Sequence, residues 1–350
     1  MGPGPVNHLH IAERRYDALV GVGGIGSGSV FAIDGAETLG REESRGGRFL
    51  DRRDYCKLHI IAHYVQTLLG PGFQTIPVGR VGDDEDGARL LREMEEAGLR
   101  TERVTEVPGR RTLFSFCFVY PDGSGGNLTT TDSASSTVDA GAVAEAEGEF
   151  ARFGGRGIAL AAPEVPLEAR AALVAMGARH DFFCATSFTS QEMRPAMEAG
   201  MLAKVDLLAI NVNEAAAAAG VDPAGEPSGI VEAGVEALGE VNPAMMVSVT
   251  AGVRGSWSWN GVSLGHAAAA DVEPVSTAGA GDAHFAGVLA GLTAGLTLPE
   301  AQELGALVAG LSVRSPHTID PSVDRDSLRA FADAAGMPLS PEVRTLLENG

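Results

Sequence analysis

Residues 276–287 read Ser-Thr-Ala-Gly-Ala-Gly-Asp-Ala-His-Phe-Ala-Gly, a run of small residues around one carboxylate, Asp282. The apolar stretch that follows, from Phe285 to Leu296, predicts a helix that begins at this turn. Such a turn leaves backbone N–H groups without partners, and together with the positive end of the helix dipole they attract an anion. A carboxylate belongs beside an anion site if Asp282 accepts a proton from a hydroxyl while a phosphoryl group is transferred. Asp is also a favoured helix cap, so the spacing alone leaves both interpretations open.

Short apolar strands alternate with helical segments along most of the chain, which predicts a mostly parallel sheet covered on both faces. The alternation is weakest over residues 26–55 and 104–135, which are therefore candidates for a small β appendage. We expect a disordered tail over residues 1–15. The expected strands cover 17–22, 74–81, 111–120, 157–161, 181–185, 207–210 and 245–250, and the expected helices cover 58–69, 86–97, 167–176, 214–219, 299–313, 325–334 and a segment from 283.

The composition limits the partners of the chain. A formal net charge of -20 over 350 residues argues against nucleic acid or an anionic membrane as partners. The three cysteines, Cys56, Cys117 and Cys184, are far apart and odd in number, which suggests reduced thiols and a cytoplasmic protein. The polar first residues predict neither a signal peptide nor a membrane anchor.

Two segments, one rich in glycine and one in acidic residues, suggest a dinucleotide site and a metal site as alternatives. Gly21-Val-Gly-Gly-Ile-Gly26 matches the dinucleotide fingerprint, on which an NAD-linked oxidoreductase would rest, but the residues after it predict strand or loop as readily as the required helix. The acids of Gly79-Arg-Val-Gly-Asp-Asp-Glu-Asp-Gly87 could hold a metal, although a turn that caps the next helix explains them better. His59 and His63 share a helix face without an evident third ligand.

Two further motifs follow predicted strands. Asn211 and Glu214 stand where a strand ends and a helix begins, and such groups suit Mg²⁺ held through water, although helix capping explains the asparagine equally well. In Thr250-Ala-Gly252-Val-Arg-Gly255, a hydroxyl and glycine amides could meet a nucleotide phosphate.

Taken in order, these motifs resemble the ribokinase/PfkB family of carbohydrate and nucleoside kinases over about residues 17–335. Ser276–Asp282 is similar to the family's C-terminal signature, Gly79–Gly87 to its N-terminal segment and Asn211-x-x-Glu214 to its Mg²⁺/phosphate motif. The resemblance implies a three-layer α/β/α fold with a mostly parallel central sheet, a kinase domain over 16–340 and a small β lid formed from 26–55 and 104–135.

The resemblance also implies the roles of individual residues. Asp282 would be the catalytic base, beside an anion hole of Gly279, Ala280 and Gly281. Asn211 and Glu214 would organise Mg²⁺ and its waters. ATP would contact Thr250, Gly252 and Gly255, with its adenine near Val275, Ser312 and His317, and a monovalent cation could accompany it.

The first half of the chain departs from the family pattern, because Gly23-Gly-Ile-Gly26 stands where the family usually has a substrate-gripping Asp. At another departure, Cys184-Ala-Thr-Ser187 replaces an Asp-Pro strand end. The candidate substrate residues are Gly24, Asp34, Gly47 and Lys57.

The sequence therefore predicts an ATP-dependent, Mg²⁺-requiring kinase that phosphorylates a hydroxyl of a sugar or sugar-like molecule. A nucleoside kinase of the same family is the nearest alternative, and a non-catalytic ligand-binding or regulatory protein is another. The family often dimerises through its lids, so a homodimer is expected.

Overall fold

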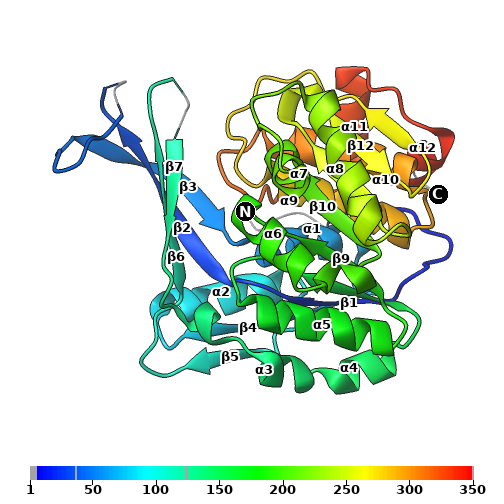
Figure 1. Ribbon diagram of the computed structural model, residues 1–350, viewed down its shortest axis with the longest axis horizontal. Helices are drawn as coiled ribbons and strands as arrows, with labels where there is room; N and C mark the ends of the chain where they lie inside the picture. The colour runs from blue at the N-terminus through cyan, green and yellow to red at the C-terminus, as the bar shows by residue number, and fades with distance from the viewer. Residues whose placement is uncertain (1–5, 36–37, 123–124, 349–350) are drawn as a thin grey trace.

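The chain is built around a nine-stranded sheet with the order β13-β12-β11-β10-β9-β8-β1-β4-β5 (Figure 1). The computed structural model describes residues 6–35, 38–122 and 125–348. The strands from β11 to β5 run parallel, whereas β12 and β13 form an antiparallel edge. The strands are β1 (Ala18–Val22), β4 (Gln74–Gly82), β5 (Val104–Val107), β8 (Gly157–Ala161), β9 (Phe183–Ser187), β10 (Leu207–Asn211), β11 (Met246–Thr250), β12 (Ser256–Trp259) and β13 (Leu264–Ala267).

Helices cover both faces of this sheet, because the buried parallel strands are apolar on both sides. In β1, Leu19 faces one core and Val20 and Val22 face the other. The predicted three-layer α/β/α architecture is therefore confirmed. On the Leu19 face lie α1 (Lys57–Leu69), α2 (Glu85–Glu96), α9 (Ala280–Thr293), α10 (Leu298–Ser312), α11 (Arg325–Ala335) and α12 (Pro341–Leu347). On the Val20 face lie α3 (Ala140–Ala144), α4 (Glu147–Arg152), α5 (Leu167–Arg179), α6 (Ser190–Glu198), α7 (Val212–Ala219) and α8 (Pro227–Val241).

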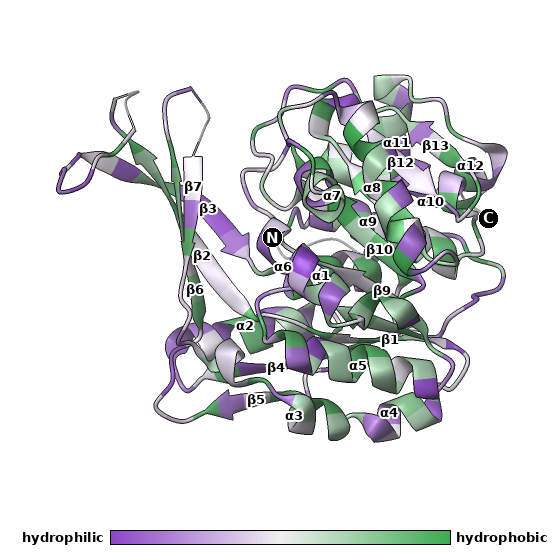
Figure 2. Ribbon diagram, in the orientation of Figure 1, coloured by the Kyte–Doolittle hydropathy of each residue, from purple (hydrophilic) through white to green (hydrophobic). Residues whose placement is uncertain are grey.

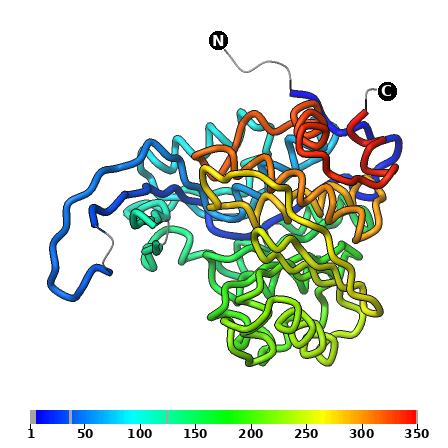
Figure 3. Tube along the Cα trace, turned by 90° about the horizontal axis from the view of Figure 1, so that it is seen from above, coloured from blue at the N-terminus to red at the C-terminus, as the bar shows by residue number. Residues whose placement is uncertain are grey.

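A second, four-stranded sheet projects from one side of the body, as Figures 1 and 3 show. Its order is β3-β2-β6-β7, with β2 antiparallel to β3 and parallel to β6. These strands lie within the two stretches expected to form a small β appendage, but β5, from the same stretches, belongs to the large sheet. The strands are β2 (Gly26–Ile33), β3 (Gly47–Tyr55), β6 (Leu113–Val119) and β7 (Gly125–Thr129).

The strand β2 explains why the glycine fingerprint is misleading. A dinucleotide site needs a helix directly after the glycines, but Gly26 begins a strand of the projecting sheet. Gly26 also lies against β6, where an added Cβ would come within 2.3 Å of the Leu113 carbonyl oxygen. The glycines of this segment therefore permit close backbone packing.

The N-terminal segment differs from the expected disordered tail. Residues 1–5 lie outside the described residues, but residues 6–15 run along the body. Leu9 is buried and its N–H donates to the Leu68 carbonyl at 2.8 Å, while the Arg15 N–H donates to the Thr293 carbonyl at 2.8 Å. This packing could not be predicted from the polar composition, because one leucine and a few backbone hydrogen bonds hold the segment.

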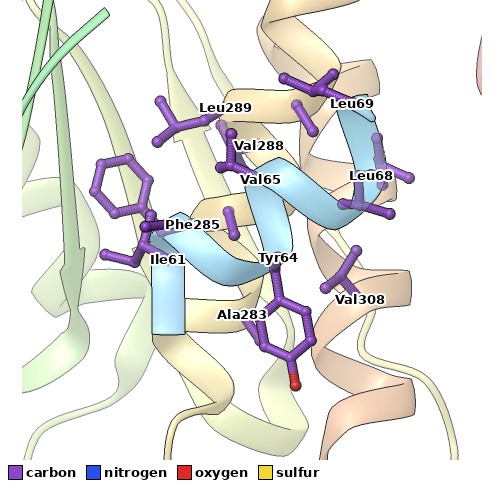
Figure 4. Packing of buried hydrophobic residues seen from close by; sticks show 14 of the residues in the cluster. Ile61, Tyr64, Val65, Leu68, Leu69, Ala283, Phe285, Val288, Leu289 and Val308 are labelled. Carbon is purple, nitrogen blue, oxygen red and sulfur yellow. The ribbon is translucent and has the colours of Figure 1, made fainter. Parts of the chain in front are cut away.

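Helices α1 and α9 pack directly against each other in the body of the molecule. Figure 4 shows Ile61, Tyr64 and Val65 of α1 beside Phe285 and Val288 of α9. Figure 2 shows that the central strands and α9 are largely apolar. Because the two helices share this contact, their N-terminal ends, Lys57 and Ala280, are held at one edge of the large sheet.

Candidate active site

The carboxyl ends of the parallel strands form the edge at which the predicted motifs meet. A cavity of about 60 Å³ at this edge is lined by residues from β9, β10, β11, α1, α7 and α9. Open parallel sheets bind their ligands at this edge. The lining residues used below are Lys57, Ser187, Asn211, Glu214, Ser248, Thr250, Gly281 and Asp282.

The turn that opens α9 has the conformation that its glycines predict. Gly279 adopts a left-handed conformation with φ 77° and precedes the first helical residue, Ala280. An added Cβ at this glycine would also meet the Thr318 Cβ at 3.0 Å. The Gly281 and Asp282 amides stand in the first turn, where a helix supplies no carbonyl to accept from them. Asp282, at the third helical position, is 9% exposed, so a buried carboxylate stands beside amides that can bind an anion.

Lys57 reaches across from the first residue of α1 and places its ammonium nitrogen 3.5 Å from Asp282 Oδ1. The carboxylate of Asp282 is the main cause that raises the pKa of Lys57, so the ammonium stays charged. The Lys57 backbone N–H donates to Glu164 Oε2 at 3.1 Å. The predicted substrate residue Lys57 and the predicted base thus lie in contact.

Glu164 is a site residue that the sequence analysis missed. It follows β8 with a positive φ of 74° and lies against Gly24, where an added Cβ would come within 2.4 Å of the Glu164 Cβ. Burial raises the pKa of Glu164 to about 7, and the charge of Lys57 lowers it only in part. The sequence signal for it was weak, a carboxylate three residues after the end of an apolar strand.

Asn211 and Glu214 form a capping box at the start of α7. The Asn211 side chain accepts from the N–H groups of Asn213 and Glu214, at 2.9 and 3.0 Å. Glu214 accepts from the Asn211 backbone N–H at 2.6 Å and from its side-chain amide at 2.9 Å. Burial raises the pKa of Glu214 to about 7. Since both its carboxylate oxygens already accept a hydrogen bond, the pair fits a hydrated Mg²⁺ contacted through water better than direct ligation.

No group of three or more His, Cys, Asp or Glu side chains that could hold a metal occurs within residues 6–35, 38–122 and 125–348. Mg²⁺ retains several waters and commonly uses one or two carboxylates together with substrate phosphates. Glu214 supplies one such carboxylate to the cavity lining, with Asn211 beside it.

The predicted nucleotide residues divide into two groups. Thr250 lines the cavity beside Gly281, where an added Cβ would be 3.9 Å from the Thr250 hydroxyl oxygen. Gly252 and Gly255, with φ values of 55° and 86°, shape the turn between β11 and β12 and lie outside the cavity lining. The turn therefore positions Thr250 through the backbone.

The predicted adenine residues lie near the end of α10. The Val275 and Ser276 N–H groups donate to the Val313 carbonyl at 2.8 and 3.1 Å, which brings the loop before α9 beside the end of α10. Ser312 is buried and donates to the Ala309 carbonyl at 2.8 Å. His317 accepts from the Arg53 N–H of β3 at 2.9 Å and lines a separate groove of about 890 Å³.

Two predicted substrate residues lie away from the cavity. Asp34 follows β2 and is exposed, with its N–H donating to the Gly46 carbonyl at 3.0 Å. Gly47 packs tightly on β2, since an added Cβ would meet the Ala32 carbonyl oxygen at 2.3 Å. Asp54, further along β3, is the carboxylate of the projecting sheet that faces the site. Burial raises the pKa of Asp54, the negative charge of Asp282 raises it further, and the positive charge of Lys57 lowers it in part.

The acid-rich segment 79–87 serves as a helix cap, the interpretation that the sequence favoured. Asp84 accepts from the Gly87 N–H at 2.8 Å and from the Thr112 hydroxyl at 2.6 Å. Burial acts to raise its pKa, but these hydrogen bonds outweigh burial and hold the pKa below its ordinary value. His284 is a buried imidazole 3.2 Å from the Ser256 hydroxyl, and burial lowers its pKa to about 4.

Comparison with known proteins agrees with this geometry. The sequence profile of the pfkB family of carbohydrate kinases matches residues 61–325. The fructoselysine 6-kinase of Shigella flexneri is 40% identical over 68 residues, which are 19% of this chain and 26% of that protein. The chain thus matches about a quarter of the length of this curated relative.

Solved structures share the whole fold at low identity. The ribokinase of Cryptococcus neoformans var. grubii serotype A, in complex with ADP, is 19% identical with a TM-score of 0.73, covering 91% of this chain and 99% of that one. A Burkholderia thailandensis nucleoside kinase in complex with inosine is 16% identical with a TM-score of 0.68, covering 91% of this chain and all (100%) of that one.

Within the described residues, no helix combines the length and the apolar character needed to cross a bilayer. The family profile covers most of the chain, and the fold is that of the ribokinases. The chain therefore belongs to the pfkB family of carbohydrate kinases.

Proposed function

We propose that the protein transfers the γ-phosphate of ATP to a hydroxyl of a sugar or sugar-like small molecule, with Asp282 as the base. The observation that carries this proposal is the buried Asp282 carboxylate beside the amide-rich N-terminus of α9. The acceptor proton passes to Asp282, the acceptor oxygen bonds to the γ-phosphorus, and the bond to the β–γ bridging oxygen breaks to release ADP. The amides of Gly281 and Asp282, in the first turn of α9, stabilise the charge on the moving phosphoryl group.

Asn211 and Glu214 would hold the waters of Mg²⁺, which neutralises phosphate charge when bound. Thr250 lies beside Gly281, where its hydroxyl can reach a phosphate oxygen. The nucleotide base would lie between the loop at Val275 and the end of α10 near Ser312, which the contacts to the Val313 carbonyl bring together.

The charges near Asp282 favour an acceptor that is neutral or carries an amine. Asp54, Glu164 and Asp282 act electrostatically on Lys57, the cation that lines the cavity. An anionic acceptor would meet more negative than positive charge there. The partial match to fructoselysine 6-kinase makes fructoselysine the first acceptor to test, followed by neutral sugars, sugar phosphates and nucleosides.

The test measures ADP release with each acceptor for the wild type, Asp282→Asn and the control Asp271→Asn, an exposed aspartate in the loop before α9. We expect Asp282→Asn to lower kcat at least 10³-fold, because it removes both the base and its charge. The variant should still bind Mg-ADP. Full activity of that variant would refute the base assignment. ADP binding without turnover of any acceptor would favour a non-catalytic ligand-binding protein.

We also propose a homodimer formed through the outer face of the projecting sheet. Phe31, Phe49 and Phe116 cluster there, with ring centroids 5.1 to 6.3 Å apart, and Phe49 is 66% exposed. Leu128, 64% exposed, pairs with Phe116 and extends the patch. Exposed apolar patches of this kind mark contact surfaces. Sedimentation of Phe49→Asp beside the wild type tests the proposal, and an unchanged mass would contradict it.

A further inference from the structure

Two buried hydroxyls at the floor of the cavity have no assigned role. Ser187, at the end of β9, is 9% exposed, and Ser248, in β11, is 1% exposed. Neither side-chain oxygen has a hydrogen-bond partner among the residues that the structure describes, and both residues line the cavity with Asn211 and Glu214. Burying an unpaired hydroxyl costs free energy, so native proteins rarely retain one without a ligand or water to bind it.

The register of the strands places the two hydroxyls on one face of the sheet. Ala209 of β10 pairs with Ser187 on one side and with Ser248 on the other. Asn211 and Thr250 pair two residues further on and therefore project from the same face. The small Ala209 side chain leaves room between the serines. One water needs roughly 10–15 Å³ of such space, so a cavity of about 60 Å³ can hold several.

Ser187 is held in place from behind by a buried arginine. Arg170 of α5 is 0% exposed and donates from Nη2 to the Ser187 carbonyl. Its guanidinium also lies 3.0 Å from Glu192 and 4.4 Å from the ring centre of Phe188, beside Ser187 in the chain. The end of β9 is thus fixed before any ligand binds, and its hydroxyl is presented to the cavity at little further entropic cost.

The surroundings decide which ligand chemistry the hydroxyls serve. A phosphate oxygen at this depth would lie beside the Glu214 carboxylate and be repelled. Waters bound to a divalent cation are strong donors, and they suit both that carboxylate and hydroxyl oxygens.

We propose that Ser187 and Ser248 accept hydrogen bonds from the water shell of the Mg²⁺ that accompanies the nucleotide. The inference rests on the proposed function and adds two residues, from β9 and β11, to the pair Asn211 and Glu214. Each serine acts through water and is a positioning residue for the metal.

The experiment uses Mn²⁺ as the probe, with ADP present, and measures bound Mn²⁺ by electron paramagnetic resonance. The proteins are the wild type, Ser187→Ala, Ser248→Ala, the double variant and Ser258→Ala. Ser258 is a matched control, because it is a buried serine in register with Ser248 but lies outside the cavity lining. We expect Mn²⁺ affinity to fall about tenfold for each cavity serine, the value of one hydrogen bond to a charged group, and to stay unchanged for Ser258→Ala.

Thermal unfolding supplies a second readout that a purely structural role would not give. Without metal, Ser187→Ala and Ser248→Ala should unfold at the wild-type temperature or above it, because each removes an unpaired buried hydroxyl. With Mn-ADP they should gain less stability than the wild type. If an alanine variant unfolds early, Ser248→Cys, which keeps the shape with a weak acceptor, replaces it in the Mn²⁺ measurement.

Wild-type Mn²⁺ affinity in the double variant would overturn the proposal while leaving the proposed kinase function intact. Failure of the wild type itself to bind ADP with Mn²⁺ would instead overturn the proposed function, and this proposal with it.

Discussion

Replacing Glu164 with glutamine should make the folded protein more stable above neutral pH. The ordinary pKa of a glutamate is 4.5, and burial raises that of Glu164 to about 7. A folded-state pKa above the unfolded value means that the folded protein holds a proton which the unfolded chain releases. The stabilisation is therefore fully present below pH 4.5 and is lost as the pH rises to about 7.

The size of the effect follows from the two pKa values. Each pKa unit corresponds to about 1.36 kcal/mol, so Glu164 should cost the wild type up to about 3 kcal/mol in unfolding free energy between pH 4.5 and pH 8. Glutamine cannot ionise, yet its oxygen can still accept from the Lys57 N–H. Burial also raises the pKa of Glu214 to about 7, so Glu164→Gln should remove about half of the combined loss.

The assay is urea unfolding at pH 5 and pH 8, followed by the fluorescence of Trp257 and Trp259 in β12. Glu168→Gln is the control, because this exposed glutamate lies four residues further along the chain. The difference in unfolding free energy between the two pH values should shrink for Glu164→Gln alone. An unchanged difference would refute the argument that burial of this carboxyl dominates.

Two further substitutions test the site. Lys57→Met removes the ammonium 3.5 Å from Asp282 and should lower kcat at least tenfold in the ADP-release assay. Lys57→Arg keeps the charge and should retain more activity. Equal activity of the wild type and both variants would show that the ion pair has no catalytic part. Gly279→Ala places a side chain at φ 77° and should lower the unfolding free energy in urea by about 1–2 kcal/mol. The control Gly148→Ala, in α4, should not destabilise the protein, because its added Cβ meets nothing within 4 Å. A Gly279→Ala variant as stable as the wild type would contradict the strained turn.

The parts of the fold that depend on local pattern could be predicted from the sequence. The strand expected at 207–210 and the helix expected at 299–313 differ from β10 and α10 by a residue at their ends. The β12–β13 hairpin was not predicted, because its strands of four residues contain Ser, Gly and His and show no apolar run. Helix α8 was also missed, although its Pro227 at the first helical position is a start signal.

The site divides in the same way. Asp282, Gly279 and Glu214 could be found because each stands in a turn whose residue types are set by local backbone geometry, which a short motif records. The role that we propose for Ser187 and Ser248 could not be predicted, since a serine in a strand has no local signature and its role depends on which strands become neighbours. Asp34 was chosen for its position in the sequence, but β2 carries it to the exposed end of the projecting sheet.

Lys57 shows why the acceptor side resists prediction from the sequence. The role of Lys57 depends on its contacts with Asp282, 225 residues away in the chain, and with Glu164, 107 residues away. These three groups meet only because α1 and α9 pack along their apolar faces and β8 ends beside them. In the sequence alone, a lysine that closely follows the charged strand β3 resembles a surface charge. In three dimensions Lys57 is the counter-charge of the Asp282 carboxylate. The proposed acceptor side is therefore organised by long-range packing, whereas the proposed phosphate side is organised by one turn.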